Sequence, residues 1–133
     1  AVNFFGSQCI CISVDVILIN KNYLIYNDLG LNLPLEEFIK EMSSINVGEF
    51  LVNSVDNDGI MNGFDIELIN KVEKMTTIPI VAAGGGGKPE HYSTLLNKTN
   101  INAVASSSIF HFTQYTPLDL KNELKKFLLE PNK

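Results

Sequence analysis

The sequence predicts an α/β protein built as half of a (βα)8 barrel, the TIM barrel. Strand-like apolar runs alternate with helix-like segments four times, which is half of the eight strand–helix units that a closed barrel needs. One face of the predicted strands carries small side chains, whereas a flat sheet covered by helices on both faces would be bulky on both. Two strands also lead into Asp-Gly or consecutive Gly shortly before a helix. We expect residues 1–133 to form a single unit.

The first strand is predicted at Gln8–Val16, where branched apolar residues alternate with Cys9, Cys11, Ser13 and Asp15. In a parallel barrel the bulky face meets the helices and the small face lines the interior. Asp15 is therefore expected at the carboxyl end of the strand, on the rim where barrel enzymes carry their catalytic groups.

The remaining elements follow in a regular order. A short extra strand is expected at Lys21–Tyr26, and Pro34 opens the first helix. Strands are then predicted at Glu49–Val55, Ile78–Ala82 and Ala103–Ser107, with helices beginning at Asp65, at Pro89 and at Thr116-Pro117. Connections of this length permit only parallel pairing between the main strands.

The composition excludes several classes of protein. The formal net charge of −5 and the isoelectric point near 4.9 argue against a nucleic-acid binder or a membrane-surface protein. No apolar run approaches the roughly 18 residues of a membrane span, so a cytoplasmic location is expected. Cys9 and Cys11 are interpreted as small core residues rather than half of a metal site, and neither a metal nor another cofactor is predicted.

Two segments have the character of phosphate sites. They are Val52–Gly59 and Ala82–Gly87, each joining a strand to a helix. Backbone N–H groups near a helix N-terminus bind anions, because the amides point outward and the helix dipole favours negative charge. All ten basic residues are Lys, so such a site would rely on backbone amides, hydroxyl groups and Lys.

Taken together, several ordered motifs resemble a known family. They are Phe5–Cys9, Ser13–Asp15, Val47–Glu49, Ser54–Gly59, Gly63–Asp65, the run from Gly84, and Ser108–Phe112. Over nearly all 133 residues the chain resembles the C-terminal half of the cyclase subunit of imidazole glycerol phosphate synthase, from just before strand 5 of its barrel to helix 8.

The resemblance implies a lyase of histidine biosynthesis. That cyclase takes ammonia from a glutaminase partner and adds it to a ribulosyl aminoimidazole intermediate that carries two phosphates. It then releases imidazole glycerol phosphate and an aminoimidazole carboxamide ribotide. Two rim aspartates act as general acid and base, and Asp15 matches one of them. The other would belong to a missing N-terminal half-barrel, so the fragment is expected to be inactive alone.

The resemblance also implies the other site residues. Asn53 and Asp58 match positions that contact the substrate between its ends, Glu49 matches an ammonia gate at the bottom of the barrel, and Gln8 matches the rim that faces the glutaminase. The residues that match the phosphate site are Gly59, Gly84, Gly85, Ser107 and Ser108.

Alternatives remain open at this point. Asn53 and the segment Phe112-Thr113-Gln114 are similar to a sister group that uses glutaminase-derived ammonia to build an amidine on a surface-polysaccharide sugar. The chain could also be a non-catalytic binding or assembly half-barrel. Asp58 could serve only a turn, and Glu49 could pair with a Lys for stability. With its first and fourth strands as unpaired edges, the isolated chain is expected to associate with itself.

Overall fold

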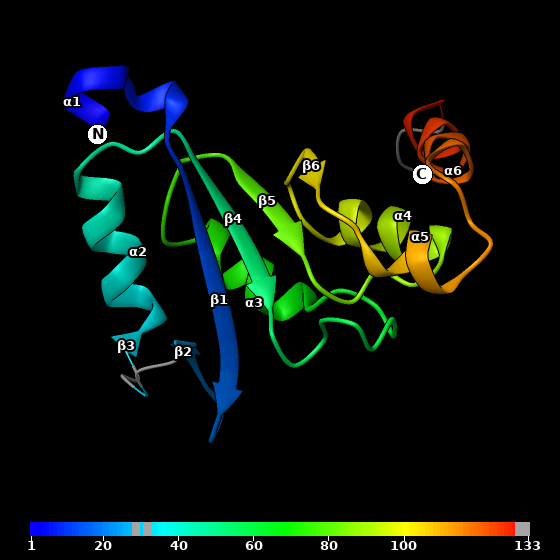
Figure 1. Ribbon diagram of the computed structural model, residues 1–133, viewed down its shortest axis with the longest axis horizontal. Helices are drawn as coiled ribbons and strands as arrows, with labels where there is room; N and C mark the ends of the chain where they lie inside the picture. The colour runs from blue at the N-terminus through cyan, green and yellow to red at the C-terminus, as the bar shows by residue number, and fades with distance from the viewer. Residues whose placement is uncertain (28–29, 31–32, 130–133) are drawn as a thin grey trace.

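The computed structural model describes residues 1–27, 30 and 33–129, with side chains described up to Lys126 (Figure 1). The strands form one six-stranded sheet in the order β3-β2-β1-β4-β5-β6. Their bounds are β1 Cys11–Ile19, β2 Asn22–Ile25, β3 Leu33–Pro34, β4 Glu49–Ser54, β5 Ile80–Ala83 and β6 Ala103–Val104. The sheet is open, and it corresponds to part of a (βα)8 barrel.

The four main strands run parallel, as predicted. β1 pairs with β4, β4 with β5 and β5 with β6, so sequence order and spatial order agree. The register sets Asp15, Asn53 and Ala83 at one level across three adjacent strands, with Ser13, Leu51 and Val81 one level below. Side chains of one level point to the same face of the sheet.

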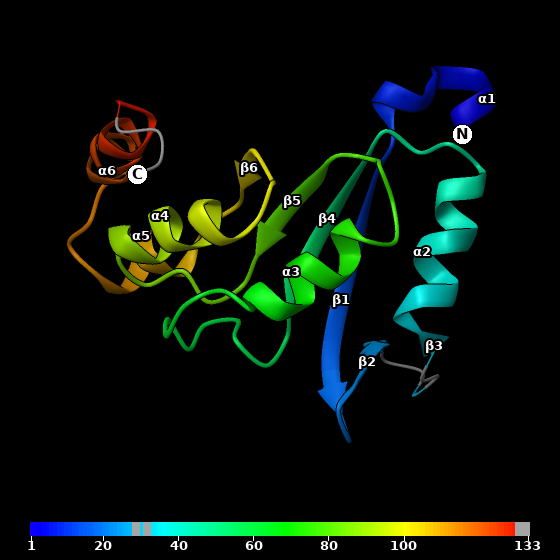
Figure 2. The same cartoon turned by 180° about the vertical axis from the view of Figure 1, so that it is seen from behind.

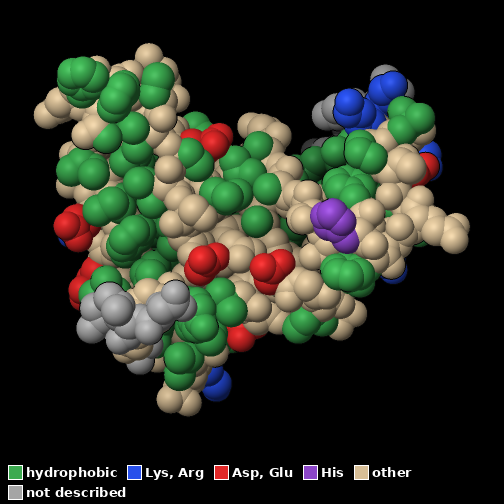
Figure 3. All heavy atoms as spheres, in the orientation of Figure 1, with side chains coloured by type: hydrophobic (Ala, Val, Ile, Leu, Met, Phe, Trp, Pro, Cys, Tyr) green, Lys and Arg blue, Asp and Glu red, His purple; other side chains and the backbone are tan. Residues whose placement is uncertain are grey.

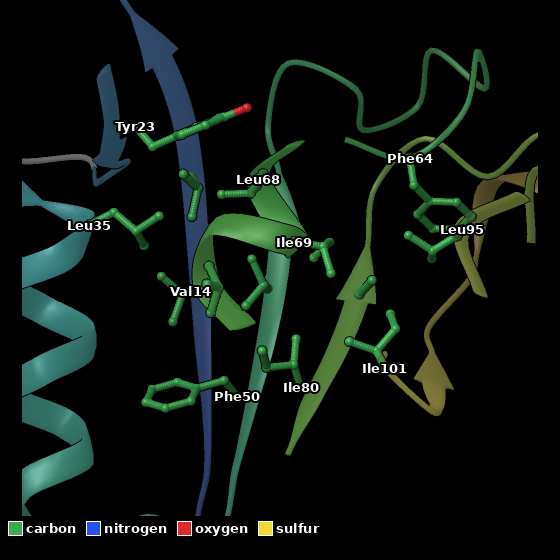
Figure 4. Packing of buried hydrophobic residues seen from close by; sticks show 14 of the residues in the cluster. Val14, Tyr23, Leu35, Phe50, Phe64, Leu68, Ile69, Ile80, Leu95 and Ile101 are labelled. Carbon is green, nitrogen blue, oxygen red and sulfur yellow. The ribbon is translucent and has the colours of Figure 1, made fainter. Parts of the chain in front are cut away.

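Helices cover one face of this sheet (Figure 2). The described helices are α1 Val2–Phe5, η1 Ser7–Cys9, α2 Leu35–Ser44, α3 Ile66–Glu73, α4 Pro89–Lys98, α5 Ser108–Phe112 and α6 Pro117–Leu129, and α2, α3 and α4 contribute to this covering layer. Phe50 and Val52 of β4 are fully buried in one cluster with residues of α2, α3 and α4. Figure 4 shows the Phe50 ring directed toward α2, with Val14 and Ile80 on the strands and Leu68 and Ile69 on α3. This layer is the hydrophobic core.

The opposite face of the sheet has no helical layer over it in the described part of the chain. Cys11, Ser13 and Asp15 are exposed, and Leu51 and Val81 are half-buried. Figure 3 shows this face with hydrophobic side chains over the strands and acidic side chains among them. The open face is the one that would line the interior of a closed barrel.

Several boundaries differ from the sequence prediction. β1 begins three residues later than expected, because Ser7–Cys9 forms a 3-10 turn, and it continues to Ile19. β6 is only two residues long. Cys9 and Cys11 are both exposed, so their interpretation as buried core residues is wrong. Ser108–Phe112 forms a separate short helix that the periodicity did not reveal.

The prediction that the first strand is an entirely unpaired edge is also wrong. β2, the extra strand predicted at Lys21–Tyr26, folds back and pairs antiparallel with Val16–Ile19 of β1. The backbone N–H of Tyr26 donates to the carbonyl of Asp15, 2.8 Å away, at the end of this pairing. Only Cys11–Asp15 therefore lacks a neighbouring strand on that side among the described residues.

Candidate active site at the carboxyl end of the strands

Three polar side chains meet on the open face where β1 and β4 end. Nδ2 of Asn53 donates to Oδ1 of Asp15 at 2.9 Å and lies 3.5 Å from Oδ2 of Asp58. The parallel register brings Asp15 beside Asn53, and Asp58 reaches them from the loop after β4. Asp15 and Asp58 are exposed and Asn53 is half-buried, so both carboxylates can reach a molecule lying on this face.

A cavity of about 250 Å³ adjoins these carboxylates. It is lined by Asn53, Asp58, Ala83, Gly84, Gly85, Gly86, Ala105, Ser106, Ser107 and Ser108. Backbone amides and hydroxyl groups dominate this lining, which is the donor set that an anion such as phosphate requires. The acidic residue in this lining is Asp58, which lies at the edge of the cavity nearest to Asp15.

The glycine run makes this cavity possible. Gly84 has φ +81°, and a β-carbon there would lie 2.7 Å from both Oδ1 of Asn53 and the carbonyl oxygen of Ser54. Gly85 has φ +104°, and its β-carbon would overlap the carbonyl oxygen of Gly63. Only glycine adopts such angles without strain, so the close approach of backbone at this turn depends on both residues.

Two hydrogen bonds fix the loop that carries the glycines. The N–H of Gly63 donates to the carbonyl of Gly85 at 2.8 Å, and the N–H of Gly87 donates to Nδ1 of His91 at 3.2 Å. His91 accepts this bond only when its ring is neutral, and burial and then Lys88 lower the pKa of His91. Sequence reasoning assigned His91 no role, although its position four residues after the run could have indicated this contact.

Three successive serines form the other wall. Ser106 is hydrogen-bonded through its hydroxyl to the hydroxyl of Tyr92, which packs edge-on against Phe64 with ring centroids 5.1 Å apart. Ser107 and Ser108 follow at the start of α5 and line the cavity, and their role in binding phosphate stays a prediction. Sequence reasoning missed Ser106 and Gly86 as lining residues.

Gly59 does not line the cavity. It lies exposed in the loop after β4 with φ +73°, and a β-carbon there would meet nothing within 4 Å. Asp56, earlier in the same loop, connects the loop to β1, because Oδ2 of Asp56 accepts the backbone N–H of Leu18 at 2.8 Å. Asp65 caps α3 by accepting from the N–H of Leu68 at 2.9 Å and also accepts from the hydroxyl of Tyr23.

The opposite end of the strands carries the residues expected near the partner. Glu49 begins β4 beside Cys11, and partial desolvation and then the Glu49 carboxylate raise the pKa of the Cys11 thiol. Gln8 lies next to this pair, since a β-carbon on Gly48 would be 2.9 Å from the Cα of Gln8. Glu49 also lines a cavity of about 480 Å³ at this end, together with Glu73, Thr76 and Asn102. The alternative in which Glu49 pairs with a Lys finds no support, because no ion pair of the described residues includes Glu49.

Within the described residues, no helix combines the length and apolar character needed to cross a membrane.

A family model for a histidine biosynthesis protein matches residues 1–116. The imidazole glycerol phosphate synthase subunit HisF of Staphylococcus saprophyticus is 34% identical over 127 residues, which is 92% of this chain and 50% of that protein.

Other relatives give the same result. The subunits named HisF from Staphylococcus carnosus and Clostridium botulinum are 36% identical over 126 residues and 34% identical over 136 residues. These alignments cover 91% and 95% of this chain and 50% and 52% of the relatives. The chain therefore spans about half the length of the curated relatives it matches, and it belongs to the histidine biosynthesis protein family.

Proposed function

We propose that this chain is the C-terminal half of a cyclase of the imidazole glycerol phosphate synthase type. The observation that carries the proposal is the position of Asp15, at the end of β1 on the open face and beside the cavity of glycines and serines. A carboxylate at this rim can move protons on a substrate whose phosphate occupies the cavity. The second acid–base group comes from the N-terminal half-barrel.

The substrate is a ribulosyl aminoimidazole with two phosphates, one of which binds in this half. Backbone amides of Gly84 and Gly85 and the hydroxyls of Ser107 and Ser108 hold that phosphate. This assignment fits a chain without Arg, because the cavity offers neutral donors instead. Gly59 supports the loop that carries Asp58 and contributes through loop shape, since it lies outside the cavity lining.

Ammonia reaches the site through the interior of the barrel. The open face presents Glu49 at its lower end, then Ser13, Leu51 and Val81, and finally the polar level of Asp15. A glutaminase partner would bind at the lower end near Gln8 and Glu49, where Glu49 admits ammonia. The middle level carries no charged side chain, so a neutral ammonia molecule can pass along it.

Turnover in the full-length protein tests this function. The protein is given the ribulosyl intermediate and an ammonium salt, and formation of imidazole glycerol phosphate is followed. Product formation and rescue of a histidine auxotroph support the proposal. Activity only on a polysaccharide sugar would assign the protein to the sugar-amidating sister group, and phosphate binding without any turnover would make it a non-catalytic module.

A further inference from the structure

Asn53 occupies a central place among the polar groups of the rim. Its side-chain nitrogen faces two carboxylates, with Oδ1 of Asp15 at 2.9 Å and Oδ2 of Asp58 at 3.5 Å. Its side-chain oxygen lies on the other side, over the turn at Gly84, where a β-carbon would come within 2.7 Å of it. The amide therefore spans the space between the carboxylates and the cavity.

The chemistry of an amide suits this position. A neutral –NH2 group carries two N–H donors, one for each carboxylate, whereas a hydroxyl group carries only one. Two like charges that face the same site repel each other, and a shared donor offsets part of that repulsion. Among the described residues that line the cavity there is no Lys that could serve instead.

We propose that Asn53 is a positioning residue that holds Asp15 and Asp58 at a fixed distance from the phosphate cavity. The proposal rests on the function given above, in which Asp15 transfers protons. Without the amide, the exposed Asp15 side chain rotates away from the productive geometry. Binding changes little, because the glycines and serines of the cavity remain in place.

Nuclear magnetic resonance of the Asn53 side chain tests the geometry without any substrate. The two amide protons are assigned in the unaltered protein and then in Asp15→Ala and Asp58→Ala. We expect the first variant to move the resonance of one proton and the second variant to move mainly the other. An amide whose two resonances are unchanged in both variants would overturn the proposal.

Kinetics of the full-length protein test the consequence for turnover. Asn53→Leu keeps the size of the side chain and removes both donors, and Asn53→Ser keeps a single donor. We expect kcat to fall about 10²-fold in Asn53→Leu, with KM changed less than about threefold, because a small displacement of a reacting group has costs of this order. Asn53→Ser should retain an intermediate rate.

The outcomes separate this proposal from the proposed function. A raised KM with unchanged kcat would make Asn53 a substrate ligand and would overturn the positioning role. Circular dichroism and the unfolding midpoint show whether Asn53→Leu is folded. If it is not, the kcat and KM of Asn53→Ser test the positioning role instead. If the unaltered protein does not turn over the ribulosyl intermediate, the proposed function fails, and the resonances alone decide the role of Asn53.

Discussion

The two faces of the same four parallel strands differ in almost every respect. On the helix-covered face, Val14, Phe50 and Val52 are at most 1% exposed and belong to one continuous core. On the other face, at positions adjacent to these in the same strands, Ser13 is exposed and Leu51 is half-buried. Because side chains alternate along a strand, one segment of sequence serves two purposes.

This difference separates stability from function. Bulky branched side chains on the covered face fill the space beneath α2, α3 and α4 and drive folding. The open face has Ser13, Leu51 and Val81 in its middle and polar side chains at its ends, and it gains little from burial within this chain. Substitutions on the first face should therefore alter folding, and those on the second should alter turnover and association.

The largest effect is expected from Phe50→Ala. Removing this fully buried ring from the core should lower the free energy of unfolding by about 3–5 kcal/mol. A domain of this size has only about 5–15 kcal/mol in total, so the variant should be largely destabilised in urea titrations. The matched control is Leu51→Ala on the adjacent open face, which should cost about 1 kcal/mol. Equal losses in both variants would contradict the division between the faces.

The next effect concerns Asp15→Asn in a restored barrel. The amide oxygen can still accept the hydrogen bond from Asn53, so stability should be almost unchanged while proton transfer is lost. We expect turnover to fall about 10²-fold or more with substrate affinity retained. Asp58→Asn should change affinity as well as rate, because it removes a negative charge from the cavity lining, which Asn53→Leu leaves in place. Steady-state kinetics measure kcat and KM of both variants. If Asp15→Asn lost affinity but kept normal turnover, Asp15 would be a binding residue instead.

Association is the third test. Half-buried Leu51 and Val81 and the strand edges favour a second copy or the missing half-barrel over water. We expect the isolated chain to sediment as a dimer or larger, and Leu51→Lys to weaken this association about tenfold or more, since it adds a charge to the contact. Ile45→Lys, at an exposed position after α2, is the control and should have no effect. A sharply monomeric chain with full cyclase activity would contradict both the contact and the need for a second half.

The smallest effect is a dependence on pH through His91. Burial and the nearby Lys88 lower its pKa, while Glu90 opposes them weakly. The unfolded chain therefore takes up a proton near pH 6.5, and the folded chain does so only at lower pH. Stability should fall as the pH drops from about 6.5 through the folded pKa, and the Gly87 bond should be lost with it. Unfolding midpoints at several pH values measure this, and His91→Gln should remove the dependence.

Much of the fold could be predicted because it depends on local pattern. Alternation along β1 and β4, the Asp65 cap and Pro89 in the first turn of α4 are all visible in the sequence and are confirmed. The ends of strands were less predictable. The short length of β6 and the turn at Ser7–Cys9 depend on neighbours distant in sequence, such as the close contact between Gly48 and Ser7.

Which side chains gather at the rim could be predicted better than how those side chains contact one another. Side chains at strand ends, such as Asp15 and Asn53, could be assigned to one rim because parallel strands end on the same side. The shared hydrogen bonds of Asn53 and the support of the glycine loop by His91 depend on exact distances between loops, which no spacing rule supplies. The exposed position of Gly59, outside the cavity lining, likewise depends on how the loop after β4 folds and could not be predicted from spacing.

The short β2 strand also limits how far another strand can pair with β1. Since β2 occupies the outer side of β1 from Val16 onward, an incoming strand can pair only along Cys11–Asp15. Five residues span about 17 Å, and a parallel strand docked there would have to end level with Asp15. The hydroxyl of Tyr23 donates a hydrogen bond to Asp65, and this contact fixes the β1–β2 hairpin against the start of α3. The hairpin thus limits how far a neighbouring strand can pair along β1 to the level of Asp15.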